Sequence, residues 1–407
     1  MTVPLTLANK PSAFQGPPLP PESSEPIIRP AEVAAKPRRV KAPRLLALDA
    51  FRGLTIFLML LVNNVSLGSQ TPAQLMHAEW SGRVHVADLV FPWFLFMVGV
   101  AVPYAAASAR KRHVSHGGYA LKAVTRTAVL VGLGCLLASV AEHRLVWTLG
   151  VLQLIGLSYL CAAIAGIFFG VRGRVVLTAL LLWAHSALLH HYPVPGVGAD
   201  AITEQANAVK YLNETLLMPL GLKGIISVIP ATAMVLIGTV AGDLLRRKKV
   251  PSLGKAGVLA SCGAGLWAGS IFWGQTLPMN KPLWTGSYIL YTAGLGCLVL
   301  SALYLLLDVP QGKVGRATRA AALPLVVFGS NAIVAYVAPI LFKFTVLQGV
   351  TVATHTQGHV TLERALQEYC YQSMGRIHGG WVYTFGYIAV WWLVLAFLYN
   401  RRWFLRA

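Results

Sequence analysis

The sequence is short of charged residues. Only 12% of its 407 residues are Asp, Glu, Lys or Arg, whereas 56% are hydrophobic. An average soluble domain carries about 25% charged and 45–50% apolar residues. So little charge cannot cover the surface of a soluble globule of this size, and a mean hydropathy of +0.61 agrees. The composition excludes an ordinary soluble protein and indicates that lipid is the main solvent.

Acidic residues are the scarcer kind of charge. There are 14 Asp and Glu against 34 Lys and Arg, which gives a formal net charge of +20. A nucleic-acid-binding protein would gather its basic residues on one soluble face. Here they stand in short runs between apolar stretches, as in the cytoplasmic loops of membrane proteins. We therefore interpret the charge as a determinant of topology and expect no nucleic-acid partner.

Cysteine is also rare, with five residues in the chain. Four of them fall inside apolar stretches and the fifth in a predicted loop, in the order Cys135, Cys161, Cys262, Cys297 and Cys370. No disulfide framework and no metal-ligand spacing emerges from these positions. We expect no metal.

The first 44 residues lack a long apolar run. They are rich in proline and polar residues instead, which is unlike a signal peptide. We expect residues 1–44 to form a disordered cytoplasmic tail, and residues 45–407 to form the membrane domain.

The rest of the chain consists largely of long apolar runs. A spanning helix needs about 20 mostly apolar residues, and about ten such runs are present. We therefore predict an all-α, polytopic transmembrane bundle of about ten helices. The expected spans are 45–67, 86–109, 119–140, 147–169, 174–190, 224–245, 253–274, 283–307, 322–344 and 381–402.

Two connecting segments, 191–223 and 345–380, are long. Residues 200–217 in the first have the mixed apolar spacing of an interfacial helix. The second holds His355, His359 and His378, whose spacing resembles no metal site, and we interpret it as a solvated loop.

Basic residues alternate from loop to loop. Loops after even-numbered spans carry clusters, whereas loops after odd-numbered spans carry scattered bases; the clusters are at 110–112, 172–174, 246–249, 313–319 and 401–406. The tail before the first span is basic as well. The positive-inside rule then predicts that both termini lie in the cytoplasm.

Polar residues concentrate around the first predicted hairpin. Two charged residues lie near the inner end of the first span, and amides, a histidine and two carboxylates lie near the outer end: Asp49, Arg52, Asn63, Asn64, His77, Glu79 and Asp88. Ionisable groups at membrane depth are costly and tend to be functional. A histidine can act as a general base or accept an acyl group, and a carboxylate can orient it. The alternative is that His77 decorates a loop and Asp88 caps a helix.

Several motifs of this chain resemble the heparan-alpha-glucosaminide N-acetyltransferase family. They are LALDAFRG at 46–53, LVNN at 61–64, HAEWSG at 77–82, ADLVFPWFLFMVG at 87–99, GVLQ at 150–153, IPATAM at 229–234, NKPLWTGSY at 280–288 and GSNAIVAY at 329–336. They follow the family order across residues 45–407, and the block from His77 to Asp88 is the most specific. Leu154 departs from the family pattern, which usually has an Arg there.

The resemblance implies a transmembrane acetyltransferase. Such an enzyme moves acetyl from cytosolic acetyl-CoA to an amino sugar or glycan on the far, periplasmic side of a bacterial inner membrane. The family's catalytic histidine, amide and carboxylate fall on His77, Asn63 and Asp88. The resemblance also implies membrane lipid as the surroundings and favours a homodimer.

Coenzyme A is anionic and cannot cross hydrocarbon, so we expect its phosphates near the basic side. Arg52, Arg126 and the run 246–249 are the candidates, although the run also sets topology and Arg52 has Asp49 as an ion-pair partner. Three further residues lie in family motifs and are candidate contacts for the co-substrate, namely Trp284, Ser287 and Asn331. Asn331 has the alternative of joining helices.

A second function class remains open from the residues alone. Polar groups near the outer surface also suit a transporter of sugars or related solutes, in which no bond is made. Binding of acetyl-CoA distinguishes the two classes, because a sugar carrier has no reason to retain a nucleotide.

Overall fold

The computed structural model describes residues 45–80, 83–354 and 358–405, and most of these residues are helical. The tail expected at 1–44 and His355 lie outside the described residues. The long helices are α1 (Leu46–Asn64), α2 (Val86–Lys111), α3 (His116–Ala141), α4 (Val151–Phe168), α5 (Val171–His191), α7 (Val228–Arg246), α8 (Ser252–Trp273), α9 (Gly286–Leu307) and α14 (Arg376–Asn400). The shorter ones are α6 (Ala208–Leu212), α10 (Gly312–Ala321), α11 (Leu323–Ser330), α12 (Ala332–Phe342) and α13 (Leu362–Met374).

The expected fold class is confirmed. Within the described ranges, the nine long helices are each long and apolar enough to cross a membrane. The predicted span 322–344 is wrong as a single helix, because α11 and α12 meet at an angle of 77°. The break lies at Asn331, which has φ −126° and ψ 53°. With the broken pair counted as one span, the described chain has up to ten spans and is a multi-pass membrane protein.

Glycines bring the central helices close together. A Cβ atom on Gly238 of α7 would lie 2.1 Å from the carbonyl oxygen of Phe96 in α2, and one on Gly53 of α1 would lie 1.7 Å from that of Leu325 in α11. Such contacts leave no room for any larger residue. In lipid, where the hydrophobic effect does not drive helices together, close backbone approach of this kind holds a bundle.

Several helix termini meet at one end of the bundle. We call it the basic end, because Arg110, Arg174 and Arg246 lie there. The Asp308 carboxylate, just after α9, accepts the backbone N–H groups of Leu46 (3.1 Å) and Ala47 (2.8 Å) at the start of α1. Arg246 at the end of α7 lies over the Tyr104 ring near the end of α2. Arginines from three of the predicted basic clusters line one cavity at this end, namely Arg110, Arg174, Arg246 and Arg247.

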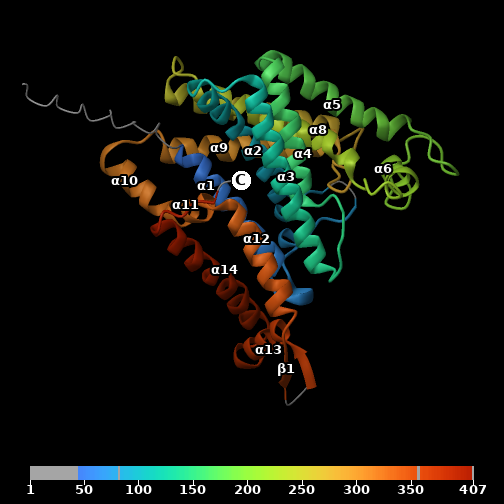
Figure 1. The fold of residues 1–407 in the computed structure, drawn as a ribbon, viewed down its shortest axis with the longest axis vertical. Helices are drawn as coiled ribbons and strands as arrows, with labels where there is room; N and C mark the ends of the chain where they lie inside the picture. Colours follow the sequence, from blue (N-terminus) through green and yellow to red (C-terminus); the bar gives the residue numbers. More distant parts are fainter. Residues whose placement is uncertain (1–44, 81–82, 355–357, 406–407) are drawn as a thin grey trace, which may run out of the picture. The chain divides into compact units, whose positions relative to one another are not determined.

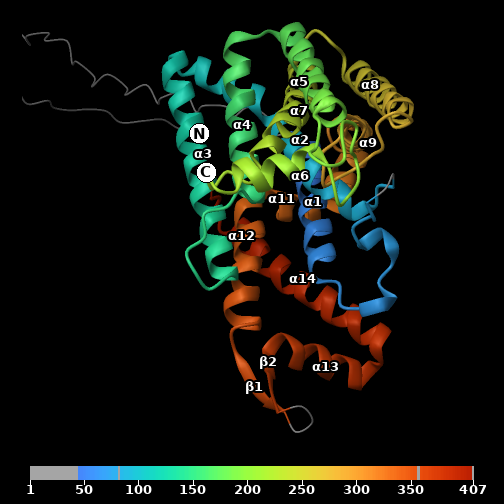
Figure 2. The same ribbon diagram turned by 90° about the vertical axis from the view of Figure 1, so that its right-hand side faces the viewer.

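The interpretation of residues 345–380 as a loop is wrong, although α13 within this segment has no buried residue. It contains an antiparallel hairpin, β1 (Thr351–Thr354) with β2 (Gly358–Thr361), followed by α13. Figures 1 and 2 both show the hairpin and α13 together, beyond the ends of α12 and α14. In the other long connection, the expected interfacial helix is short: α6 runs into one π-helical turn, Asn213–Leu217.

Candidate active site

Asp88 lies in the first turn of α2 and is 2% exposed. Its Oδ2 accepts two backbone N–H groups, from His85 (3.0 Å) and from Ala78 (3.1 Å). The first of these bonds caps the helix, and the second ties down the loop that carries His77. Its other oxygen, Oδ1, is left to face side chains.

His77 meets that second oxygen. Its Nδ1 lies 2.9 Å from Asp88 Oδ1, and the imidazole side chain is 61% exposed. A proton on Nδ1 would be donated to the carboxylate, and Nε2 would then keep its lone pair. The Asp88 carboxylate thus caps α2 and also holds the imidazole of His77, so the capping role does not exclude the role of orienting His77.

Lys281 completes the cluster, and it was missed as a site residue in the sequence. Its Nζ lies 3.2 Å from Asp88 Oδ1 and 2.9 Å from His77 Nδ1. Burial lowers the pKa of Lys281, although the Asp88 carboxylate acts in the opposite direction. The only sequence signal was its position inside the motif 280–288, because the interaction spans 204 residues.

The loop before α9 is docked on the His77 loop by polar contacts. Asn280 Nδ2 donates to the carbonyl of Trp80 (2.7 Å), and the Tyr288 hydroxyl donates to the carbonyl of Asp88 (2.6 Å). Both Asn280 and Tyr288 are buried. These two contacts fix Lys281 relative to the imidazole.

Two cavities meet at His77, Phe91 and Lys281. The first, about 220 Å³, is bounded by α1, α2, the start of α4 and Tyr336 of α12, and its wall is mostly apolar. The second, about 270 Å³, opens on the loop side among Glu79, Arg83, Trp284 and other residues. The imidazole therefore faces a mostly apolar cavity within the bundle and, on the loop side, a second cavity with more charged residues in its wall.

Asn63 lies in the first cavity with His77. Its side-chain amide is exposed and makes no hydrogen bond to any residue that the structure describes. On α1 the same cavity is bordered by Met59 and Thr55, one and two turns toward the basic end. Arg52 follows one turn further along the same face, about 16 Å from Asn63 at 1.5 Å per residue.

Arg52 and Arg126 interact electrostatically near the basic end of this face. Arg52 contacts Asp49 (3.3 Å) and the carbonyl of Gly329 (3.5 Å). The Arg126 guanidinium lies over the Tyr159 ring at 4.6 Å, and its Nε is buried without a hydrogen-bond partner among the described residues. Two neighbouring guanidinium groups, one of them with a spare donor, make this a place where an anion would be stabilised.

The remaining candidates fall in different places. Trp284 borders the second cavity and packs edge-on against Phe91, with ring centroids 5.2 Å apart. Ser287 is fully buried and donates to the carbonyl of Leu277 (2.6 Å), so it borders neither cavity. Asn331 lies at the α11–α12 break and holds the C-terminal segment, through Trp403 O (2.9 Å) and Leu405 N (3.0 Å). The structure therefore brings Trp284 to His77, but not Ser287 or Asn331.

Comparisons with known proteins agree with the sequence motifs. A family model described as "Heparan-alpha-glucosaminide N-acetyltransferase, catalytic" matches residues 44–268. The heparan-alpha-glucosaminide N-acetyltransferase of Mus musculus is 26% identical over 382 residues, which cover 78% of this chain and 56% of that protein. The Homo sapiens protein of the same name is 25% identical over 370 residues, covering 74% and 53%. The chain spans about half the length of these curated relatives.

Proposed function

This chain belongs to the heparan-alpha-glucosaminide N-acetyltransferase family, and from that premise we propose that it is a transmembrane acetyltransferase. In this proposal acetyl-CoA enters from the cytosol. The acceptor is an amino sugar or glycan amine on the periplasmic side of a bacterial inner membrane. Both chain termini lie in the cytoplasm, a placement supported by the packing of Leu46 and Tyr399, near the two described chain ends, against one buried cluster.

The observation that carries the proposal is the position of His77 between two cavities. The inner cavity is small, at about 220 Å³, and mostly apolar, which suits the thioester arm of coenzyme A. The outer cavity carries Glu79 and Arg83, which suit a hydroxylated, amine-bearing sugar. A group between a donor and an acceptor that arrive from opposite sides can serve both, so neither substrate needs to cross the membrane.

The arm would follow the face of α1 that joins the two ends of the bundle. Asn63 and Thr55 border the cavity, and Arg52 continues the same face toward the basic end. The phosphates, which cannot enter hydrocarbon, would then be held by Arg52 and Arg126. Arg126 offers a spare Nε–H donor for this role.

The transfer itself uses groups within the cluster. The acceptor nitrogen attacks the thioester carbonyl carbon while His77 Nε2 takes a proton from that nitrogen, and Asp88 holds Nδ1–H. The amide of Asn63 donates to the carbonyl oxygen as negative charge develops there. The carbon–sulfur bond then breaks, and the coenzyme A thiolate takes the proton from His77. An acetyl-histidine intermediate would use the same atoms in two steps.

The test is His77→Ala in proteoliposomes, with transfer from radiolabelled acetyl-CoA to glucosamine as the readout. We expect a loss of at least 100-fold with acetyl-CoA binding retained, because a positioned general base contributes about 10²–10⁴-fold. The matched control is His190→Ala. That histidine also pairs with a carboxylate, Asp200 at 2.6 Å, but borders neither cavity.

Transfer that survives His77→Ala would overturn the mechanism. If the wild-type protein moves sugars across the membrane and does not bind acetyl-CoA, the transporter hypothesis replaces the acetyltransferase hypothesis.

A further inference from the structure

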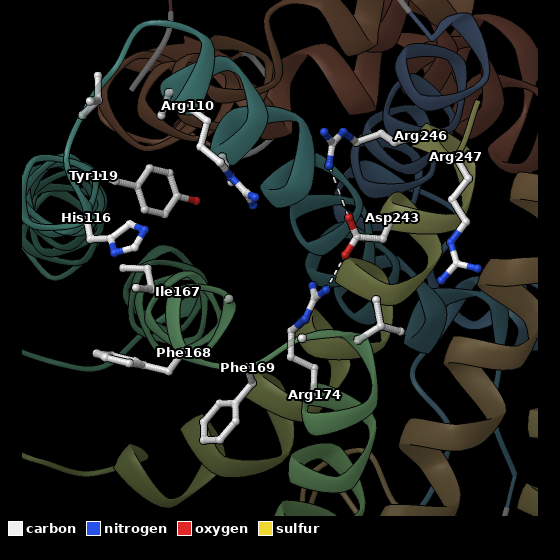
Figure 3. Close-up of a pocket in the computed structure, with 16 residues that line it drawn as sticks. Arg110, His116, Tyr119, Ile167, Phe168, Phe169, Arg174, Asp243, Arg246 and Arg247 are labelled. Carbon is white, nitrogen blue, oxygen red and sulfur yellow. Dashed lines mark hydrogen bonds and ion pairs between the residues drawn. The ribbon is translucent and has the colours of Figure 1, made fainter. Parts of the chain in front are cut away.

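A third cavity, lined by basic residues, lies at the basic end of the bundle, away from the proposed path of acetyl-CoA. It has a volume of about 510 Å³ and is formed by the ends of α2, α4 and α7 and the starts of α3 and α5, with no residue of α1. Four arginines and one aspartate line it, so these five side chains leave a net charge of +3. Figure 3 shows Asp243 between Arg246 and Arg174, with Arg110 and Arg247 on either side.

The buried arginine in this cavity is incompletely satisfied. Arg174 is 6% exposed and pairs with Asp243, which Arg246 also contacts at 3.3 Å. One carboxylate therefore serves two guanidinium groups. Arg174 Nε is buried and has no hydrogen-bond partner among the described residues. A buried donor without an acceptor destabilises a protein, so an anion in the cavity would remove a penalty that the protein otherwise carries.

A helix N-terminus adds to this positive potential. α5 has 21 residues, and its first residue, Val171, lines the cavity together with the preceding Gly170. Glycine has no side chain to cap the helix, so the N–H groups of the first turn remain as donors. Such a terminus favours phosphate or another anion.

An apolar groove continues from this cavity. It has a volume of about 750 Å³, lies between α5, α7, α8 and α9, and shares Val171, Asp243 and Arg247 with the basic cavity. Its wall is otherwise mostly apolar, and the four helices are all long and apolar enough to span a membrane. The groove therefore lies at the depth of lipid acyl chains.

We propose that the two cavities together bind one anionic phospholipid. Its phosphate lies among Arg110, Arg174 and Arg247, and one acyl chain lies in the groove between α5 and α8. Basic pockets between transmembrane helices favour anionic headgroups, and the excess positive charge disfavours a zwitterionic one. A nucleotide or free phosphate would use the arginines but would leave the groove without an occupant.

The test uses the purified full chain after delipidation. Binding of phosphatidylglycerol and phosphatidylcholine is measured by native mass spectrometry, and the thermal midpoint is followed in parallel. We expect phosphatidylglycerol to bind more tightly and to raise the midpoint more.

The headgroup variant is Arg110→Gln with Arg247→Gln, which leaves the buried Arg174–Asp243 pair intact. We expect about 10- to 30-fold weaker phosphatidylglycerol binding, from two lost headgroup charges. The matched control, Lys248→Gln with Lys249→Gln, removes the same charge from the same end of the bundle outside the cavity. It should leave binding within about threefold of the wild type.

The groove variant is Gly265→Leu. Gly265 lines the groove, and a Cβ atom there meets no atom within 4 Å, so the larger side chain fills the space of the acyl chain without a clash. The control is Gly257→Leu, because Gly257 of α8 does not line the groove and has equally open surroundings. We expect Gly265→Leu to weaken lipid binding and Gly257→Leu to leave it unchanged.

Three results would overturn the proposal. The first is equal binding of both lipids. The second is that the arginine double variant weakens phosphatidylglycerol binding, Gly265→Leu does not, and coenzyme A or inorganic phosphate displaces the lipid. That result would make the cavity a nucleotide or phosphate site. The third is a change of oligomeric state in Gly265→Leu without loss of lipid, which would make the groove an interface between two copies.

Discussion

Replacing Asp88 by Asn keeps the size of the side chain and removes its charge. The amide oxygen can still accept the N–H groups of His85 and Ala78, so these two bonds lose only their charge-assisted part. The ion pair between Asp88 Oδ1 and Lys281 Nζ (3.2 Å) is lost as well. We expect a loss of roughly 1–2 kcal/mol in the free energy of unfolding. The protein should therefore remain folded in membranes.

The chemical effect should be much larger. The new NH₂ group would point at His77 Nδ1, now 2.9 Å from Oδ1, and two donors cannot bond each other. The imidazole then carries its proton on Nε2 and accepts through Nδ1, so Nε2 can no longer take a proton. The rate of acetyl transfer should fall by about 10²–10⁴-fold, the usual contribution of a general base.

The assay is single-turnover transfer from radiolabelled acetyl-CoA to glucosamine, with acetyl-CoA binding measured separately. Asp200→Asn is the matched control, because Asp200 pairs with His190 at 2.6 Å far along the chain from His77. It should leave transfer unchanged. An Asp88→Asn rate within threefold of the wild type would refute the proposed tautomer control.

Arg126→Gln should raise the KM for acetyl-CoA about tenfold with little change in kcat, because it removes one charge-assisted contact to a phosphate; steady-state kinetics measures both. Gly238→Ala should destabilise the bundle by about 1–3 kcal/mol or more, because its Cβ would lie 2.1 Å from Phe96 O; the thermal midpoint in detergent reports this. Burial lowers the pKa of Lys281, so the folded state holds that proton less tightly than the unfolded state does. The resulting stability is present above the ordinary lysine pKa and is lost as the pH falls through the lowered pKa. Between these two pKa values, the thermal midpoint of Lys281→Gln should therefore change less with pH than that of the wild type.

Each of these changes has a comparison that isolates its cause. Lys122 lies one turn from Arg126 on α3, and Lys122→Gln should leave the KM for acetyl-CoA unchanged. Gly132→Ala, where a Cβ atom meets nothing within 4 Å, should not destabilise. A slope with pH in Lys281→Gln equal to that of the wild type would show that another group titrates.

The apolar runs predicted the spans because helix length and hydropathy are properties of contiguous residues. The run 322–344 is equally apolar, yet it breaks at Asn331 because the Asn331 side chain bonds Trp403 and Leu405. That partner lies over 70 residues away, and no local pattern contains it. The hairpin at β1 and β2 was missed for a different reason: each strand has only four residues, too few to show a clear alternation of apolar and polar residues.

The candidate site was partly visible in the sequence. His77 and Asp88 are separated by 11 residues, so a single loop before α2 can bring them together. Lys281 and Tyr288 reach the same carboxylate residue from about 200 residues away, through a loop docked by Asn280. Ser287 shares that motif but faces its own loop carbonyl, which shows that a motif selects a segment and not the direction of each side chain.

A structure of the protein with acetyl-CoA bound tests the central claim most directly. The account predicts the acetyl carbonyl carbon within hydrogen-bonding reach of His77, beside Asn63, with the arm along α1 toward Arg52. An acetyl group bound away from the imidazole, for example among the arginines around Asp243, would contradict it.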